Sequence, residues 1–120
     1  QIAQAAAANG PRIYELRTYT TNDGKLNDLH ARFANHTNHL FVRHHMTLIG
    51  YWTPAEGETK GKTLTYLIGH ESRDAAKKNW SGFVNDPDWK KVYAASRENG
   101  PLVNNIESTF LDPTDYSPLR

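Results

Sequence analysis

The chain contains no cysteine, and this absence removes several kinds of site at once. Disulfide bonds, thiolate metal centres, iron–sulfur clusters and cysteine nucleophiles are all excluded, although the redox compartment stays open. The sequence also lacks the G-x-S-x-G, P-loop and dinucleotide-binding patterns. Hydrolase, NTPase and Rossmann chemistry therefore have no support from motifs.

Long apolar runs and blocks of one charge are also missing. No apolar stretch approaches the roughly 20 residues that a membrane-spanning helix needs. The 120 residues include 14 basic and 13 acidic side chains, and like charges do not gather beyond pairs such as Lys77-Lys78. Neither nucleic acid nor a membrane span is therefore expected. The length corresponds to one domain.

The first ten residues are small and polar, include a run of alanines, and show no packing pattern. We predict a disordered tail over residues 1–11 and one folded domain over residues 12–120. Small residues of this kind are typical of the segment that follows a signal-peptide cleavage site. They favour a periplasmic or exported protein, and a plain tail on a cytoplasmic protein is the alternative.

The remainder of the chain alternates between strand and helix patterns. Residues 13–20 alternate in a way that predicts a strand with Glu15, Arg17 and Tyr19 on one face. Apolar residues then recur at spacings of three or four, which indicates a helix. The patterns predict helices over 24–44, 73–84 and 87–98, and further strands over 47–53, 63–71 and 102–111.

This order predicts an α+β, ferredoxin-like βαββαβ fold, with a four-stranded antiparallel sheet and helices on one face. The middle strands carry large apolar residues on both faces, for example Leu48 and Trp52 against Ile49 and Tyr51. Strands that are buried on both faces lose polar alternation. We therefore predict a homodimer in which the two sheets pack face to face.

Histidines are concentrated around residues 36–45. His36 and His39 occupy neighbouring positions of one predicted helix face, and His44 follows two turns after His36. The cluster lacks an H-E-x-x-H pattern and has no adjacent carboxylate, so neither a metal nor a cofactor is predicted. His36 and His44 are the candidates for a catalytic base. Packing, or capping of the helix end, is the alternative role.

Arg17 lies on the same strand face as Glu15, and a buried guanidinium is costly unless it is paired. It could pair with Glu15 or Glu107, or it could orient an anionic or phenolic ligand. An ion pair buried at a dimer interface is the alternative. Aromatic side chains could line a pocket for a flat molecule, or they could simply form the core. The candidate ligand-binding residues are Arg17, Tyr19, Trp52, Tyr66 and Glu107.

Four segments together resemble the NIPSNAP family, which belongs to the dimeric α/β-barrel group. They are YELRTYT at 14–20, HHMTLIGYWTP at 44–54, ESRDAAKKNWSGFVNDPDWKKV at 71–92 and ESTFLDPTDYSPL at 107–119. The resemblance implies the ferredoxin-like fold and a barrel-like dimer. One departure is His45, where similar sequences are expected to have glycine, at the turn between the first helix and the second strand.

The resemblance implies a function only weakly. Eukaryotic relatives are associated with mitochondria and vesicle traffic, and other branches of the barrel group include cofactor-independent monooxygenases, haem-degrading oxygenases and isomerases. The leading hypothesis is a protein that binds a small apolar or aromatic molecule in a cavity. The alternatives are a cofactor-independent oxygenase or isomerase that uses His36 or His44 as base, and a non-catalytic interaction module.

Overall fold

The structure is a computed structural model that describes residues 13–120; the tail expected over 1–11 lies outside the described residues. The elements follow the predicted order, with small differences at their ends. They are β1 (Ile13–Thr21), α2 (Leu26–Arg32), η1 (Phe33–Thr37), α3 (Asn38–Arg43), β2 (Thr47–Trp52), β3 (Thr63–His70), α4 (Arg73–Asn85), α5 (Pro87–Ser96) and β4 (Val103–Leu111).

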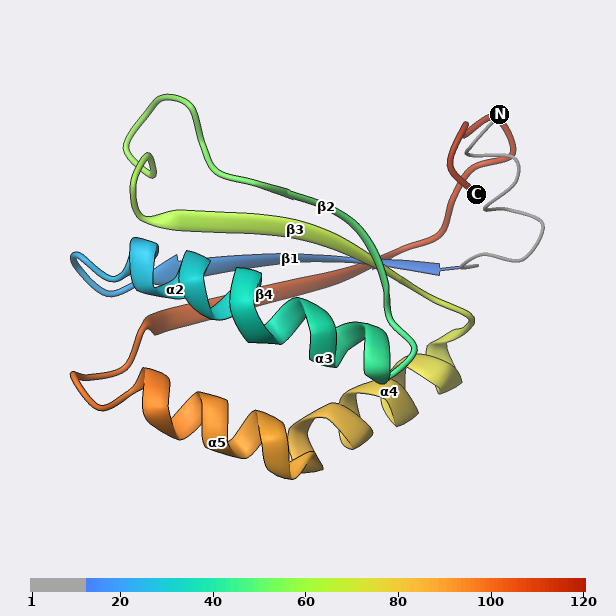
Figure 1. Cartoon of the computed structure of the whole chain (residues 1–120). Coiled ribbons are helices and arrows are strands. Elements are labelled where there is room, and N and C mark those ends of the chain that lie inside the picture. Colours follow the sequence, from blue (N-terminus) through green and yellow to red (C-terminus); the bar gives the residue numbers. More distant parts are fainter. Residues whose placement is uncertain (1–12) are drawn as a thin grey trace.

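The strands form one antiparallel sheet in the order β2-β3-β1-β4. All the helices lie on one face of this sheet, and the other face carries none (Figure 1). The four-stranded, ferredoxin-like α+β arrangement is therefore confirmed. In the described part of the chain, no helix combines the length and the apolar character needed to cross a bilayer.

The first helical segment, α2 to α3, is interrupted by the π-helical turn η1. The apolar stripe that predicted the helix is buried against the sheet, and Thr37 of η1 lies within it. Its hydroxyl donates a hydrogen bond to the carbonyl oxygen of Arg32 at 3.2 Å. Single π-helical turns occur often at functional sites, and this one lies over the aromatic core.

The two helices of the second half of the chain, α4 and α5, both begin with a side-chain cap. The Ser72 hydroxyl accepts a hydrogen bond from the Ala75 amide at the start of α4. The Asp86 carboxylate accepts one from the Asp88 amide at the start of α5, and Pro87 occupies the first turn. Serine and aspartate are residue types that commonly cap helices, and proline is favoured in the first turn. The caps fix the residue at which each helix begins. The starting residue in turn determines which side chains of the helix face the sheet.

The turn before β2 contains a backbone conformation that L-residues rarely adopt. His45 has a φ of 68°, and it is the single non-glycine residue with positive φ in the described chain. Glycine is the residue that tolerates this left-handed conformation without steric cost. The position where similar sequences were expected to carry glycine is thus a position where the fold requires a left-handed turn.

The pairing register assigns side chains to the two faces of the sheet. Glu15, Arg17 and Tyr19 share one face, as the alternation predicted. This face is the one that the helices cover, because Arg17 is paired with Tyr66 of the aromatic core. Leu16 is paired with Leu67 on the helix-free face. On that face, the β2–β3 connection and the C-terminal segment both rise away from the sheet (Figure 1).

Candidate functional site

A buried carboxylate organises the space between the sheet and α4. Glu15 on β1 is 2% exposed. Its Oε1 accepts hydrogen bonds from His70 Nε2 at 2.9 Å and from Trp80 Nε1 at 2.8 Å. Its Oε2 accepts from Arg17 Nη1 at 2.9 Å and from the Ser108 hydroxyl at 2.6 Å. The carboxylate thus uses all of its acceptor capacity on protein groups.

These donors keep Glu15 ionised although it is buried. Burial alone would raise the pKa of a carboxyl group. The hydrogen bonds from His70, Ser108 and Trp80, together with the charge of Arg17, outweigh this effect and lower the pKa of Glu15 to about 2. The carboxylate is therefore a fixed negative charge at neutral pH.

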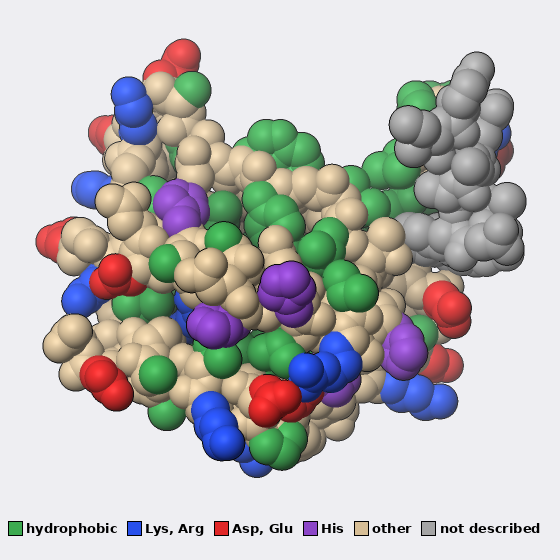
Figure 2. All heavy atoms as spheres, viewed as in Figure 1, with side chains coloured by type: hydrophobic (Ala, Val, Ile, Leu, Met, Phe, Trp, Pro, Cys, Tyr) green, Lys and Arg blue, Asp and Glu red, His purple; other side chains and the backbone are tan. Residues whose placement is uncertain are grey.

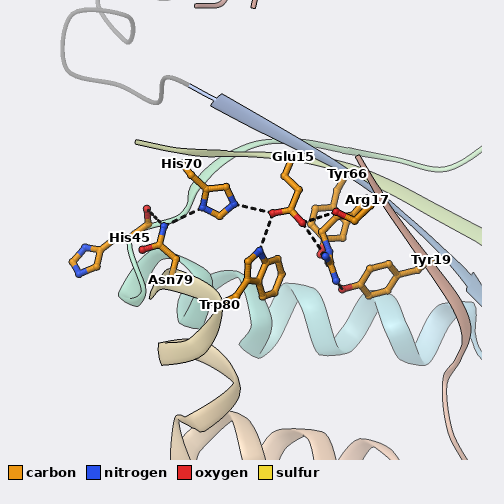
Figure 3. A network of polar contacts seen from close by, with 9 residues as sticks. Glu15, Arg17, Tyr19, His45, Tyr66, His70, Asn79 and Trp80 are labelled. Atoms are coloured by element: carbon orange, nitrogen blue, oxygen red, sulfur yellow. Dashed lines mark hydrogen bonds and ion pairs between the residues drawn. The ribbon is translucent and has the colours of Figure 1, made fainter. Parts of the chain in front are cut away.

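His70 at the end of β3 is held between Glu15 and α4 (Figure 3). Its Nδ1 lies 3.0 Å from Asn79 Nδ2, and that amide also contacts the His45 carbonyl oxygen at 3.5 Å. A carbonyl oxygen is an acceptor, so the Asn79 amide nitrogen donates to it and to Nδ1. In this arrangement Nδ1 is an acceptor, and His70 donates from Nε2 to Glu15.

Arg17 joins the carboxylate to two phenols. Its Nε donates to the Tyr66 hydroxyl at 2.9 Å, and its Nη2 donates to the Tyr19 hydroxyl at 3.2 Å. Its guanidinium also lies over the Trp80 ring, with 4.3 Å between Cζ and the ring centroid. Burial would lower the pKa of Arg17, but Tyr66, Tyr19 and Glu15 outweigh it and raise the pKa.

The two phenols share one hydrogen bond, with 2.9 Å between their oxygens. Tyr66 is fully buried, and its hydroxyl contacts Arg17 and Tyr19. Because a guanidinium is only a donor, the Tyr66 proton has Tyr19 as its acceptor. Tyr19 therefore accepts from both Arg17 and Tyr66, and its own proton remains available to a third group.

Tyr19 also lines a cavity of about 350 Å³ between the β4 side of the sheet and the helices. The cavity has the size and the apolar character of small-molecule sites. Six of its fifteen lining residues are aromatic, and their rings pack edge to face or tilted, such as Phe83 and Trp89 with centroids 4.5 Å apart. We name it the aromatic cavity; its aromatic lining residues are Tyr19, Phe33, Phe41, Phe83, Trp89 and Tyr93.

The comparisons with known proteins agree with this architecture. The family model for NIPSNAP matches residues 14–118. The chain belongs to the NIPSNAP family. Among solved structures, it is similar to a NIPSNAP family protein of Agrobacterium tumefaciens, with a TM-score of 0.78, 24% identity, and coverage of 90% of this chain and 98% of that chain. A search among curated proteins finds no match.

Two further solved structures extend the range of similar proteins. A NIPSNAP-like domain protein of Burkholderia xenovorans has a TM-score of 0.76 and 20% identity, with 88% of each chain covered. SnoaB from Streptomyces nogalater, a cofactor-independent oxygenase, has a TM-score of 0.59 and 16% identity, with 91% of this chain and 99% of that chain covered. At these identities the similarity concerns the fold.

Within this NIPSNAP domain, three of the five predicted ligand-binding residues meet. Arg17, Tyr19 and Tyr66 form the hydrogen-bonded group described above, on the helix-covered side of the sheet. Glu107 is paired with Thr18 and lies on the opposite, helix-free face. Arg17 pairs with Glu15 and not with Glu107. This ion pair lies on the helix-covered face of the sheet, whereas the predicted dimer contact uses the helix-free face.

Trp52 also lies outside the group. It is at the end of β2, is 56% exposed, and its ring covers Gly50, where an added Cβ would lie 2.5 Å from the indole. Glycine at this position therefore provides the space for the indole ring. This arrangement places Trp52 on the helix-free face with Thr65, its partner in the register.

Neither His36 nor His44 lines the aromatic cavity. His36 is exposed on η1, beside a separate hollow that also includes Lys91. His44 ends α3, and its Nε2 lies 2.7 Å from Asp86 Oδ2. This hydrogen bond is the largest cause of the lowered pKa of Asp86, which is about 2. His44 thus ties the end of α3 to the start of α5.

Histidine side chains are scattered among hydrophobic and charged ones on the face seen in Figure 2. In the part of the chain that the structure describes, no group of three or more His, Asp or Glu side chains is placed to hold a metal ion. His70, which is the histidine that the fold buries, was not among the candidates predicted from the sequence. Its alternation with Tyr66 and Ile68 on β3 is the signal that places it on the core face.

Proposed function

We propose that this NIPSNAP protein binds a small, flat, apolar or aromatic molecule in the aromatic cavity. The observation that carries the proposal is the cavity itself, about 350 Å³ in volume and walled by aromatic rings. Aromatic walls favour flat ligands because stacked and edge-to-face contacts add to the burial of apolar area. The available proton of Tyr19 supplies a donor that would orient a ligand oxygen.

Calorimetric titration with 2-naphthamide, a neutral flat probe, tests this proposal. Val103 lines the cavity, so Val103→Phe should fill part of it and weaken binding at least tenfold. Val92 borders the neighbouring hollow but not the cavity, so Val92→Phe is the matched control and should bind as the wild type does. Absence of binding to the folded wild-type protein would favour the non-catalytic interaction module.

A homodimer through the helix-free face is part of the proposal. Leu16 and Leu67 are paired there and are only partly buried, and Trp52 is exposed on the same face. Large apolar side chains on an open face favour association. In analytical ultracentrifugation, Leu67→Lys should shift the protein to monomer. The exposed Val84 of α4 provides the control Val84→Lys, which should not change the mass.

A cofactor-independent oxygenase or isomerase is the second candidate function. The favouring observation is that Tyr19 lines the cavity while it accepts hydrogen bonds from Arg17 and Tyr66. A phenol polarised in this way can stabilise an oxyanion that develops on a bound enol or phenol. In this version Tyr19 stabilises the developing oxyanion and Arg17 polarises Tyr19, which differs from the role of base that the sequence assigned to His36 or His44.

Oxygen uptake in the presence of a dihydroxynaphthalene separates this candidate from simple binding. If the protein is an enzyme, the rate of oxygen uptake should exceed the protein-free rate. Tyr19→Phe should lower this rate at least tenfold while circular dichroism shows an unchanged fold. Equal rates for the two proteins would leave only the binding role.

A further inference from the structure

Arg32, at the end of α2, is a buried cation that lines the aromatic cavity. It is 7% exposed. One of its terminal nitrogens donates to the Ser96 hydroxyl at 3.1 Å, while its Nε is buried without a hydrogen-bond partner. Among the described residues, no carboxylate lies within 4.0 Å of its guanidinium. A buried donor that lacks a partner is costly, so native structures rarely leave one unused.

Two aromatic rings give Arg32 its remaining contacts. Its Cζ lies 5.3 Å from the Trp89 ring centroid and 5.6 Å from that of Tyr93. Such cation–π contacts hold the guanidinium in place, but they leave its positive charge without a counter-charge. Burial accordingly lowers the pKa of Arg32.

A second cation borders the same cavity. Arg97 donates to the Tyr93 hydroxyl at 2.8 Å and lies over the Tyr93 ring, 5.0 Å from its centroid. Arg32 and Arg97 are the charged residues of the cavity lining, and no Asp or Glu borders the cavity. Like charges in one lining disfavour each other unless an anion lies between or beside them.

We propose that the ligand of the aromatic cavity is an anion: a flat apolar molecule whose carboxylate, or an equivalent oxyanion, accepts hydrogen bonds from Arg32. The inference rests on the proposed binding function and names the class of its ligand. A guanidinium is a planar, charged donor that suits a carboxylate. Arg97 adds a longer-range attraction from the rim, and the aromatic walls hold the apolar body.

The neighbouring hollow is a less suitable place for such an anion, although Arg32 borders it too. It includes the carboxylate of Asp28, which repels an anion, and it has no aromatic wall. The cavity and the hollow also differ in their second cation, which is Arg97 for the cavity and Lys91 for the hollow. This difference supplies a matched control.

The test compares 2-naphthoate with 2-naphthamide, two probes of nearly the same shape that differ in charge, by calorimetric titration at neutral pH. The wild-type protein should bind 2-naphthoate about tenfold more tightly or better, as expected for a buried charge-assisted hydrogen bond. Arg32→Met should remove this preference and keep the affinity for 2-naphthamide. Lys91→Met should keep the preference.

Each other outcome overturns a different statement. Equal affinities of the wild type for the two probes would overturn the anion inference and leave the binding function standing. A preference that survives Arg32→Met, in a folded variant, would show that the anion lies elsewhere and overturn the assignment. If neither probe binds the folded wild-type protein, the proposed function fails and the inference fails with it.

Discussion

Two arginines of the layer between the sheet and the helices are in opposite situations. Arg17 pairs with Glu15 at 2.9 Å, donates to two phenols and stacks on Trp80. Arg32 stacks on Trp89 in a similar way, but no described carboxylate pairs with it. The first cation is satisfied within the fold. The second is satisfied only in part, and it is the one that a ligand would complete.

The pKa shifts follow this difference. Burial acts to lower the pKa of both guanidinium groups. For Arg17, its phenolic and carboxylate neighbours outweigh burial and the pKa is raised, whereas for Arg32 burial prevails and the pKa is lowered. A buried charge with its own counter-ion supports the fold, while one without a counter-ion is a reason to look for a ligand.

Removing the counter-ion of Arg17 should have the largest effect. Glu15→Gln keeps the size of the side chain but leaves Arg17 without an anion, so we expect a loss of about 3 kcal/mol in the free energy of unfolding. Urea titration measures this loss. The exposed Glu71 provides the control Glu71→Gln, which should change the value by less than about 0.5 kcal/mol. A loss below about 1 kcal/mol for Glu15→Gln would contradict a structural role for the pair.

Acid should weaken the Arg17 pair in a defined pH window. The pKa of Glu15 is lowered from its usual 4.5 to about 2 in the folded protein. Its contribution to stability is therefore complete above about pH 4.5 and is lost as the pH falls toward about 2. Unfolding measured across this range should show a shallower loss for Glu15→Gln than for the wild type. Asp86, whose pKa is also about 2, should account for part of the slope that remains.

A substitution at His45, at the end of the Glu15 network, should have a smaller effect on the free energy of unfolding. His45 has a φ of 68°, and its carbonyl oxygen contacts the Asn79 amide that orients His70. His45→Gly should raise the free energy of unfolding by about 1 kcal/mol, because the left-handed conformation costs L-residues roughly that amount. The exposed His39 in α3 provides the control His39→Gly, which should lower stability. Thermal unfolding of both variants gives the sign, and a loss for His45→Gly would contradict the strain argument.

Removing the Arg32 guanidinium should change the stability of the unliganded protein least. Arg32→Met keeps an unbranched, apolar side chain and removes a charge that has no described counter-ion. The free energy of unfolding should change by no more than about 1 kcal/mol in either direction. A loss as large as that expected for Glu15→Gln would show that Arg32 is a structural cation like Arg17. The contrast between the two arginines would then disappear.

Much of the architecture follows from local chemistry in the sequence. Strand alternation placed Glu15, Arg17 and Tyr19 on one face, and the helices predicted over 73–84 and 87–98 begin in the structure directly after their caps, Ser72 and Asp86. These predictions succeed because periodicity and capping depend on neighbours within a few residues.

Other features depended on tertiary structure alone. Glu15 receives three of its four hydrogen bonds from residues 55, 65 and 93 positions away, namely His70, Trp80 and Ser108. The register of β4 turned Ser108 toward Glu15 and Glu107 away from it, and a shift by one residue would exchange the two. The missing partner of Arg32 is likewise invisible in the sequence, because a counter-ion from any distant element could have met it. Local sequence determined which side chains point the same way, and the packing of distant elements decided which charges meet.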